Sequence, residues 1–158
     1  MKTFIRLILL WLVFWLGSNP SQASDYCRKQ RLNPLKVGDV ITTIYWSDAD
    51  SGRANGVCFR MKDVDAAETG PVGFRGGAKC EAERVIGFKS KEDVKNYTSD
   101  KTIIVNATYG FDDFHRQLVG FDIDGRDLKK AGLREGFYKS WIFISGKKTH
   151  EKPNYCHE

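Results

Sequence analysis

The chain has 158 residues, with 25 basic and 20 acidic side chains and a formal net charge of +5. This length suits one domain with a single core, and no internal repeat, low-complexity tract or interdomain linker divides it, which excludes a repeat protein or a multidomain arrangement. The mild basic excess permits a polyanionic partner without requiring one, because such a balance also serves solubility.

The first residues predict a secretory signal peptide rather than part of the fold. Lys2 and Arg6 give a basic start, and Leu7–Leu16 is an unbroken apolar run that ends shortly before small residues suited to cleavage after Ala23. The run is too short to span a bilayer comfortably, which argues against an uncleaved anchor. We expect a secreted or periplasmic domain over 24–158, with no stable membrane association after cleavage.

Four cysteines remain in the mature chain: Cys27, Cys58, Cys80 and Cys156. An even number in an exported protein predicts two disulfides, with three possible connectivities. We favour Cys58–Cys80, around the charged segment described below, and Cys27–Cys156, near the two mature ends. A zinc site is the alternative, but the chain has no CxxC pair, and only Cys156 has a histidine beside it.

The expected elements follow from hydrophobic periodicity and from the glycines, prolines and β-branched residues that punctuate the chain. In chain order they are an extended polar segment at Ser24–Lys36, a strand at Val37–Trp46, a short strand near Gly52–Ala54, a strand at Val57–Val64, a loop at Thr69–Gly77, a helix at Ala78–Asn96, strands at Thr102–Tyr109 and Gln117–Ile123, a helix at Arg126–Arg134, an extended segment at Trp141–Ile144 and a weakly specified tail at Lys147–Glu158. This order matches neither regular β–α alternation nor an all-β sandwich. It predicts the α+β class, in the form of a five-stranded OB-fold β-barrel with packed α-helices.

The most informative segment is Phe59–Thr69, which follows Asp48–Ser51 closely. It combines a guanidinium, carboxylates suited to a metal and a candidate general base where a strand gives way to a loop. Charge concentrated at a strand end indicates a site rather than a solvated face. Phosphodiester hydrolysis needs these parts: a cation to offset phosphate charge, a base to orient water, and arginines for the transition state.

These residues resemble the staphylococcal nuclease (thermonuclease) family over about Val37–Glu151. The matching pieces are Asp48-Ala49-Asp50-Ser51, Phe59-Arg60 through Asp65-Ala66-Ala67-Glu68-Thr69, Asp112-Asp113-Phe114-His115-Arg116 before a strand, and Asp124-Gly125 before a helix with Leu133-Arg134-Glu135-Gly136. The resemblance implies a calcium-dependent nuclease that cleaves both DNA and RNA with little sequence specificity and leaves 3′-phosphate ends. We expect it to act as a monomer.

The resemblance also implies a role for each matching residue. Asp50 and Asp65 would give carboxylate oxygens to a calcium ion, and Ala66 its backbone carbonyl. Oxygen donors without cysteine or histidine suit calcium rather than a softer metal.

The remaining matches are catalytic: Glu68 would orient or deprotonate the attacking water, while Arg60 and Arg116 would clamp the phosphate with paired donors. The assignment of Arg116 depends only on its position before a strand, and Arg75 or Arg84 could take its role.

The chain departs from the family where a terminal phosphate and a base are held. Asp113 and Phe114 stand where the family has a lysine and a tyrosine, and Ile142 and Ile144 where it has two tyrosines. Pro153 and the chain end leave no room for the family's third helix, which a Cys27–Cys156 disulfide could replace as a fastener. These losses keep two alternatives open: a catalytically inactive OB-fold module that binds single-stranded nucleic acid, and an exported, disulfide-bonded interaction module.

Overall fold

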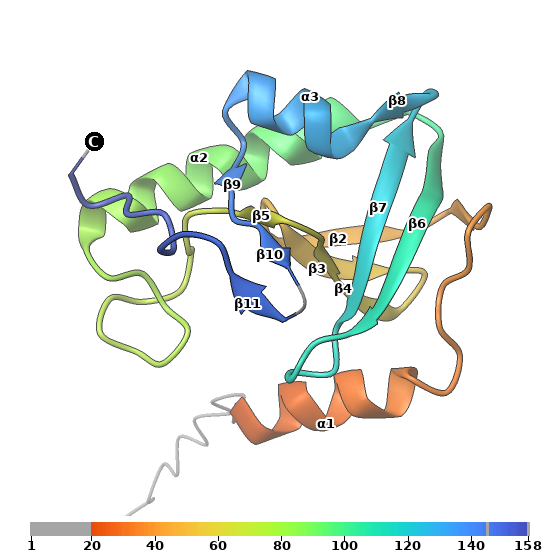
Figure 1. Ribbon diagram of the computed structural model, residues 1–158, viewed down its shortest axis with the longest axis horizontal. Coiled ribbons are helices and arrows are strands. Elements are labelled where there is room, and N and C mark those ends of the chain that lie inside the picture. The colour runs from red at the N-terminus through yellow and green to blue at the C-terminus, as the bar shows by residue number, and fades with distance from the viewer. Residues whose placement is uncertain (1–19, 145, 158) are drawn as a thin grey trace, which may run out of the picture.

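The computed structural model describes residues 20–144 and 146–157 (Figure 1). The expected signal peptide lies outside the described residues, except for its last four, which open the first helix. Within the described part of the chain, no helix is long and apolar enough to cross a membrane.

The described residues form three helices and eleven strands. The helices are α1 (Pro20–Gln30), α2 (Glu81–Thr98) and α3 (Leu128–Glu135). The strands are β1 (Val40–Ile41), β2 (Ile44–Asp48), β3 (Ser51–Ala54), β4 (Val57–Met61), β5 (Val64–Asp65), β6 (Ile103–Phe111), β7 (Gln117–Ile123), β8 (Arg126–Asp127), β9 (Lys139–Ser140), β10 (Phe143–Ile144) and β11 (Lys147–Lys148).

The strands build one mixed sheet and two small pairs. The main sheet has the order β1-β6-β7-β4-β3-β2, with β8 paired to β7, while β5 pairs with β9 and β10 with β11. Strands β4 and β7 run parallel, and the other pairs are antiparallel. The α+β class is therefore confirmed. The sheet does not close into a barrel, because β1 and β2 stand at opposite ends of this path, so the OB-fold is not confirmed.

The core lies on the inner face of the main sheet, under α2 and α3 (Figure 1). The ring of Phe59 is at its centre, with edge-to-face contacts to Trp46 at 5.2 Å and Phe121 at 5.1 Å between centroids. Alternate residues of a strand point to opposite faces. Because Val57, Phe59 and Met61 of β4 belong to the core, Arg60 between them points to the outer face.

Two expected strands are each split in the structure. Val37–Trp46 becomes β1 and β2, and Val57–Val64 ends at Met61 before resuming as β5. The second break falls at Asp63, whose φ of 64° is left-handed, a conformation that aspartate adopts more readily than bulky residues. This break turns the chain away from the main sheet, so that Asp65 is carried into a separate pairing with Lys139.

The N-terminal expectation was wrong. Residues 24–30 of the segment expected to be extended belong to α1, and the basic Arg28 and Lys29 in its last turn suit the negative end of the helix dipole. Tertiary contacts then hold the helix in place, because the hydroxyl of Tyr26 donates to the carbonyl of Gly56 at 3.1 Å. The weakly specified tail is also more ordered than expected, since it begins with β11, which pairs with β10.

Two disulfides are present, as expected, but the favoured connectivity was wrong. Cys27 pairs with Cys58, with 5.4 Å between Cα atoms, and Cys80 pairs with Cys156 at 6.0 Å. The reason is three-dimensional: Cys58 lies on the outer face of β4, against α1, whereas Cys80 caps α2 beside the C-terminal tail. Every described cysteine is paired, so none is left for a zinc site.

We predict that peptide mapping without reduction recovers only the Cys27–Cys58 and Cys80–Cys156 cross-links. Removing Cys80–Cys156 by paired serine substitutions should lower the free energy of unfolding by roughly 4 kcal/mol, because the bond closes a long loop of the unfolded chain. Chemical denaturation of the oxidised variant and parent measures the difference. A Cys27–Cys156 peptide in the digest would contradict this connectivity.

Candidate active site

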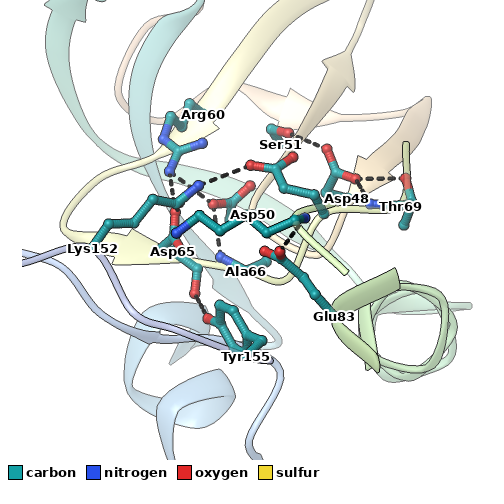
Figure 2. A network of polar contacts seen from close by, with 12 residues as sticks. Asp48, Asp50, Ser51, Arg60, Asp65, Ala66, Thr69, Glu83, Lys152 and Tyr155 are labelled. Atoms are coloured by element: carbon teal, nitrogen blue, oxygen red, sulfur yellow. Dashed lines mark hydrogen bonds and ion pairs between the residues drawn. The ribbon is translucent and has the colours of Figure 1, made fainter. Parts of the chain in front are cut away.

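Two loops come together at one edge of the sheet, and side-chain to backbone hydrogen bonds join them. The turn between β2 and β3 provides Asp50, whose Oδ2 accepts from the backbone N–H of Ala66 at 3.0 Å. Asp48, the last residue of β2, accepts from the N–H of Thr69 at 3.1 Å and from its hydroxyl at 2.6 Å. The loop after β5 is therefore fixed at Ala66 and at Thr69 (Figure 2). Glu68 lies between these two anchors in the sequence.

Arg60 draws the carboxylates to one point. Its Nη2 lies 3.1 Å from Asp50 Oδ2 and 3.1 Å from Asp65 Oδ1, and it also donates to the carbonyl of Val64 at 3.4 Å. Burial alone would lower the pKa of Arg60, but Asp50, Asp65 and Glu68 outweigh it and raise that pKa. The guanidinium stays charged and holds the acidic residues within reach of one another.

Asp65 is fully buried, and this sets its chemistry. Burial raises the pKa of its carboxyl to about 6; Asp50 adds to the shift, while Lys152 and Arg60 oppose it. Its Oδ2 is buried and has no hydrogen-bond partner among the described residues. A buried oxygen of this kind is costly unless something pairs with it. Burial raises the pKa of Glu68 as well, with Lys152 opposing the shift.

Lys152 joins the site from the C-terminal tail, and the sequence analysis missed it. Its Nζ lies 3.0 Å from Glu68 Oε1 and 3.3 Å from Asp65 Oδ1. Figure 2 shows Lys152 beside Asp65 and Arg60. Burial would lower the pKa of Lys152, but the two carboxylates raise it, so the ammonium remains charged. The cluster then has three carboxylates against two cations.

The tail that bears Lys152 is attached at two further points. The hydroxyl of the buried Tyr155 donates to the carbonyl of Asp65 at 2.5 Å, and Cys156 is bonded to Cys80 at the start of α2. Trp141 contributes its ring, which lies 5.7 Å from the Nζ of Lys152 and 5.9 Å from the guanidinium of Arg60. A lysine in a polar tail has no distinguishing pattern of its own; the nearby cysteine was the only hint that this tail returns to the fold.

The structure brings Arg60, Asp50, Asp65, Ala66 and Glu68 together as expected, but not Arg116. The guanidinium of Arg116 pairs with Asp112 at 2.7 Å, and no hydrogen bond or ion pair joins it to the cluster within residues 20–144 and 146–157. Arg116 does precede β7, in which Leu118 is opposite Arg60. By strand alternation it falls on the same outer face of the sheet, so its role stays a prediction.

Neither alternative arginine is tied to the carboxylates. Arg84 pairs with Glu81 within α2, and Arg75 has no ion pair in the described part of the chain. Arg60 is therefore the arginine that the described geometry connects directly to the acidic residues.

Gly87 explains how closely α2 approaches the loop that bears Glu68. A Cβ at this position would lie 2.6 Å from the carbonyl oxygen of Glu68 and 2.8 Å from that of Ala67. Both neighbours are backbone atoms, which cannot rotate away. A glycine that weakens a helix in isolation is here the residue that lets α2 buttress the loop bearing Glu68.

The donor set fits a hard cation in its chemistry. Two carboxylates converge within 3.1 Å of a single guanidinium nitrogen, and the buried Asp65 Oδ2 lacks a partner. Calcium accepts carboxylate and carbonyl oxygens in flexible geometry. No cluster of three or more His, Cys, Asp or Glu side chains arranged to hold a metal occurs among the described residues, so any calcium would also depend on the backbone or water.

Comparisons with known proteins do not add to this geometry. No protein-family model matches the chain, and no curated protein is significantly similar to it. The arrangement of the site residues therefore has to support any assignment by itself.

We predict that Gly87→Ala destabilises the protein by roughly 1–3 kcal/mol, because the new methyl group must push the helix or the loop aside. Thermal unfolding followed by circular dichroism measures the effect. Val85→Ala, at an exposed position of the same helix, is the matched control and should change stability by less than about 0.5 kcal/mol. Equal stabilities for Gly87→Ala and the parent would contradict the close approach.

Proposed function

We propose that this protein is an exported nuclease that hydrolyses phosphodiester bonds in DNA and RNA. The observation that carries the proposal is the convergence of Asp50, Asp65 and Glu68 around Arg60 at the outer end of β4. Packing of the core does not require a cluster of charged side chains. Burying these charges is costly, which favours a function that uses them. Secretion, a monomeric state, little sequence specificity and 3′-phosphate products belong to the same proposal.

The finer fold assignment, a five-stranded OB barrel, is part of this proposal. Its support is that β1 and β2, at the two ends of the sheet path, are consecutive in the chain and separated only by Thr42 and Thr43. A single bent strand that contributes to both edges of a sheet is how a small barrel can close.

Each residue has a distinct part in the proposed reaction. The Arg60 guanidinium would hold the scissile phosphate and offset the charge that grows on its oxygens. Such electrostatic stabilisation of the transition state is large in a site from which water is excluded. Glu68, whose pKa is raised by burial, would orient the water and accept its proton. Arg116 would supply the second guanidinium, from the position just before the adjacent strand β7.

Asp50, Asp65 and the Ala66 carbonyl would hold the calcium ion. Bound there, calcium would supply positive charge to the phosphate and lower the pKa of a coordinated water. In the described structure Lys152 contacts the same Asp65 and also Glu68. Its ammonium and a divalent cation would therefore compete for these carboxylates.

A second candidate is a catalytically inactive module that binds single-stranded nucleic acid. Lys152 favours it, because its ion pair with Glu68 holds the proposed general base. The loss of the family's phosphate lysine and stacking tyrosines points the same way. An inactive binder would leave the buried carboxylate cluster without a use, so we place the nuclease first.

We predict calcium-dependent release of acid-soluble nucleotides from heat-denatured DNA by the oxidised protein, abolished by a chelator. Glu68→Gln and Arg60→Lys should each lower the rate by roughly a hundredfold or more, because each removes transition-state stabilisation. Glu92→Gln, at an exposed helical ion pair with Lys95, is the control and should keep the parent rate. No release by a folded protein would instead favour the inactive binder.

We predict that Lys152→Met binds calcium at least about tenfold more tightly than the parent, because the variant lacks the like charge that opposes a divalent cation. Titration calorimetry at fixed pH measures the affinity, and Trp141 fluorescence reports movement of the tail. Lys148→Met is the control: it removes the same charge from the same tail, but Lys148 pairs with the exposed Glu151. Equal calcium affinities for the Lys152 variant and the parent would contradict the competition.

A further inference from the structure

A pair of side chains on the outer face of the sheet lies next to the candidate active site. Tyr45 of β2 is opposite Arg53 of β3, Arg53 is opposite Cys58 of β4, and Arg60 is opposite Ser51. Opposite residues of paired strands share a face, and so do residues two apart in one strand. Tyr45 and Arg53 are therefore on the same face as Arg60, one step or about 7 Å farther along the strands.

The cations of this surface rest on aromatic rings rather than on carboxylates. The Arg53 guanidinium lies 5.0 Å from the ring centroid of Tyr45 and 5.5 Å from that of Tyr26, and the Lys91 ammonium lies 5.6 Å from that of Tyr45. Neither Arg53 nor Lys91 forms an ion pair within the described ranges 20–144 and 146–157. Both charges are thus available to an external anion.

Tyr26, Tyr45 and Arg53, but not Lys91, border a shallow cavity of about 250 Å³, whose other walls are Thr43, Ile44 and Gly56. One wall is α1, which is held against the sheet by the Cys27–Cys58 disulfide and by the hydrogen bond from the Tyr26 hydroxyl to Gly56. The opposite ring is open, since 52 % of the Tyr45 surface is exposed. A rigid concavity with exposed rings and unpaired cations differs from a solvated charged face.

We infer that Tyr26, Tyr45, Arg53 and Lys91 form a subsite for a single-stranded nucleic acid, outside the catalytic cluster. A base stacks on the exposed face of Tyr45, and Arg53 and Lys91 contact the adjacent phosphates. Every base has a π-face, so stacking of this kind tolerates any sequence, and unpaired cations give the salt dependence typical of strand binding. The inference rests on the proposed function in one respect: that the bound nucleic-acid strand continues from the subsite to Arg60.

The subsite offers stacking in place of the family's two tyrosines, which this chain does not have. Ile142 lies just before β10 and Ile144 lies on it, and neither presents a ring. The ring of Phe114 is covered by the Arg116 guanidinium, 5.4 Å from its centroid. The Trp141 ring lies 5.9 Å from the Arg60 guanidinium, and a second stacking position would lengthen the contact with the strand. Rings one step along the sheet supply that contact on the other side of Arg60.

The test measures fluorescence anisotropy of a labelled oligothymidylate of twelve residues with the full oxidised protein in chelator, so that no cleavage occurs. Tyr45→Ala should weaken binding roughly tenfold or more, the loss of one stacked base. Tyr45→Phe should bind like the parent, because the ring remains. Arg53→Ala should reduce the slope of log affinity against log salt by about 0.7, the release of one counterion from a single strand.

Lys101→Ala is the matched control. Lys101 also lies over a tyrosine, 4.1 Å from the ring centroid of Tyr97, but between α2 and β6, so losing its charge should leave the affinity within about twofold. Equal binding by Tyr45→Ala and the parent, or equal losses in Lys101→Ala and Arg53→Ala, would overturn the subsite.

A second assay separates this inference from the proposed function. Hydrolysis of bis(p-nitrophenyl) phosphate with calcium reports on the catalytic cluster alone, because the substrate is too short to reach Tyr45. If the protein hydrolyses bis(p-nitrophenyl) phosphate and the Tyr45→Ala variant binds the oligonucleotide like the parent, the subsite is refuted but the proposed nuclease activity is supported. Weakened binding by that variant in a protein that hydrolyses nothing would support the subsite in an inactive binder.

Discussion

The buried charge of Asp65 is the constraint on which the rest of the site depends. A carboxylate without solvent must be neutralised or matched by cations, and here Asp50 and Glu68 add further negative charge nearby. Two cations answer it: Arg60 from the sheet and Lys152 from the tail. The positions of β4, β5 and the C-terminal segment are therefore coupled through one side chain.

This coupling gives the tail a structural reason. The Tyr155 hydroxyl bonds to the backbone of Asp65, and the Cys80–Cys156 disulfide ties the same segment to the start of α2. Gly87 of α2 lies close to the loop bearing Glu68, so the helix, the disulfide and the tail are all attached to the segments that bear the acidic residues. Loosening any of these attachments changes the electrostatics of the site as well as the stability of the fold.

The outer face of the sheet bears both the proposed catalytic group and the proposed binding subsite. Strand alternation sends Phe59 and Met61 into the core and Arg60 outward. It also aligns Arg60 with Arg53 and Tyr45, at the distance of one step along the strands. The pleat that builds the core thereby sets the spacing between the proposed catalytic group and the proposed contact for the strand.

The sequence by itself determined the elements that depend on local pattern. The β-branched run that forms β6, the alternation of β7 and the periodicity of α2 all lie where expected, within a few residues. The cluster of Arg60, Asp65 and Glu68 was also recognisable, because a strand of known alternation followed by a short loop confines its charges to one edge.

Only the tertiary structure decided the long-range pairings. The cysteine partners, the entry of Lys152 and the local pairing of Arg116 with Asp112 depend on contacts between segments far apart in the chain or on the choice between nearby partners. The helical state of α1 belongs with them, since its short polar sequence has little preference and packing against β4 stabilises it. Local periodicity has no information on which distant segment supplies a counter-charge, so these features appear only when the chain is folded.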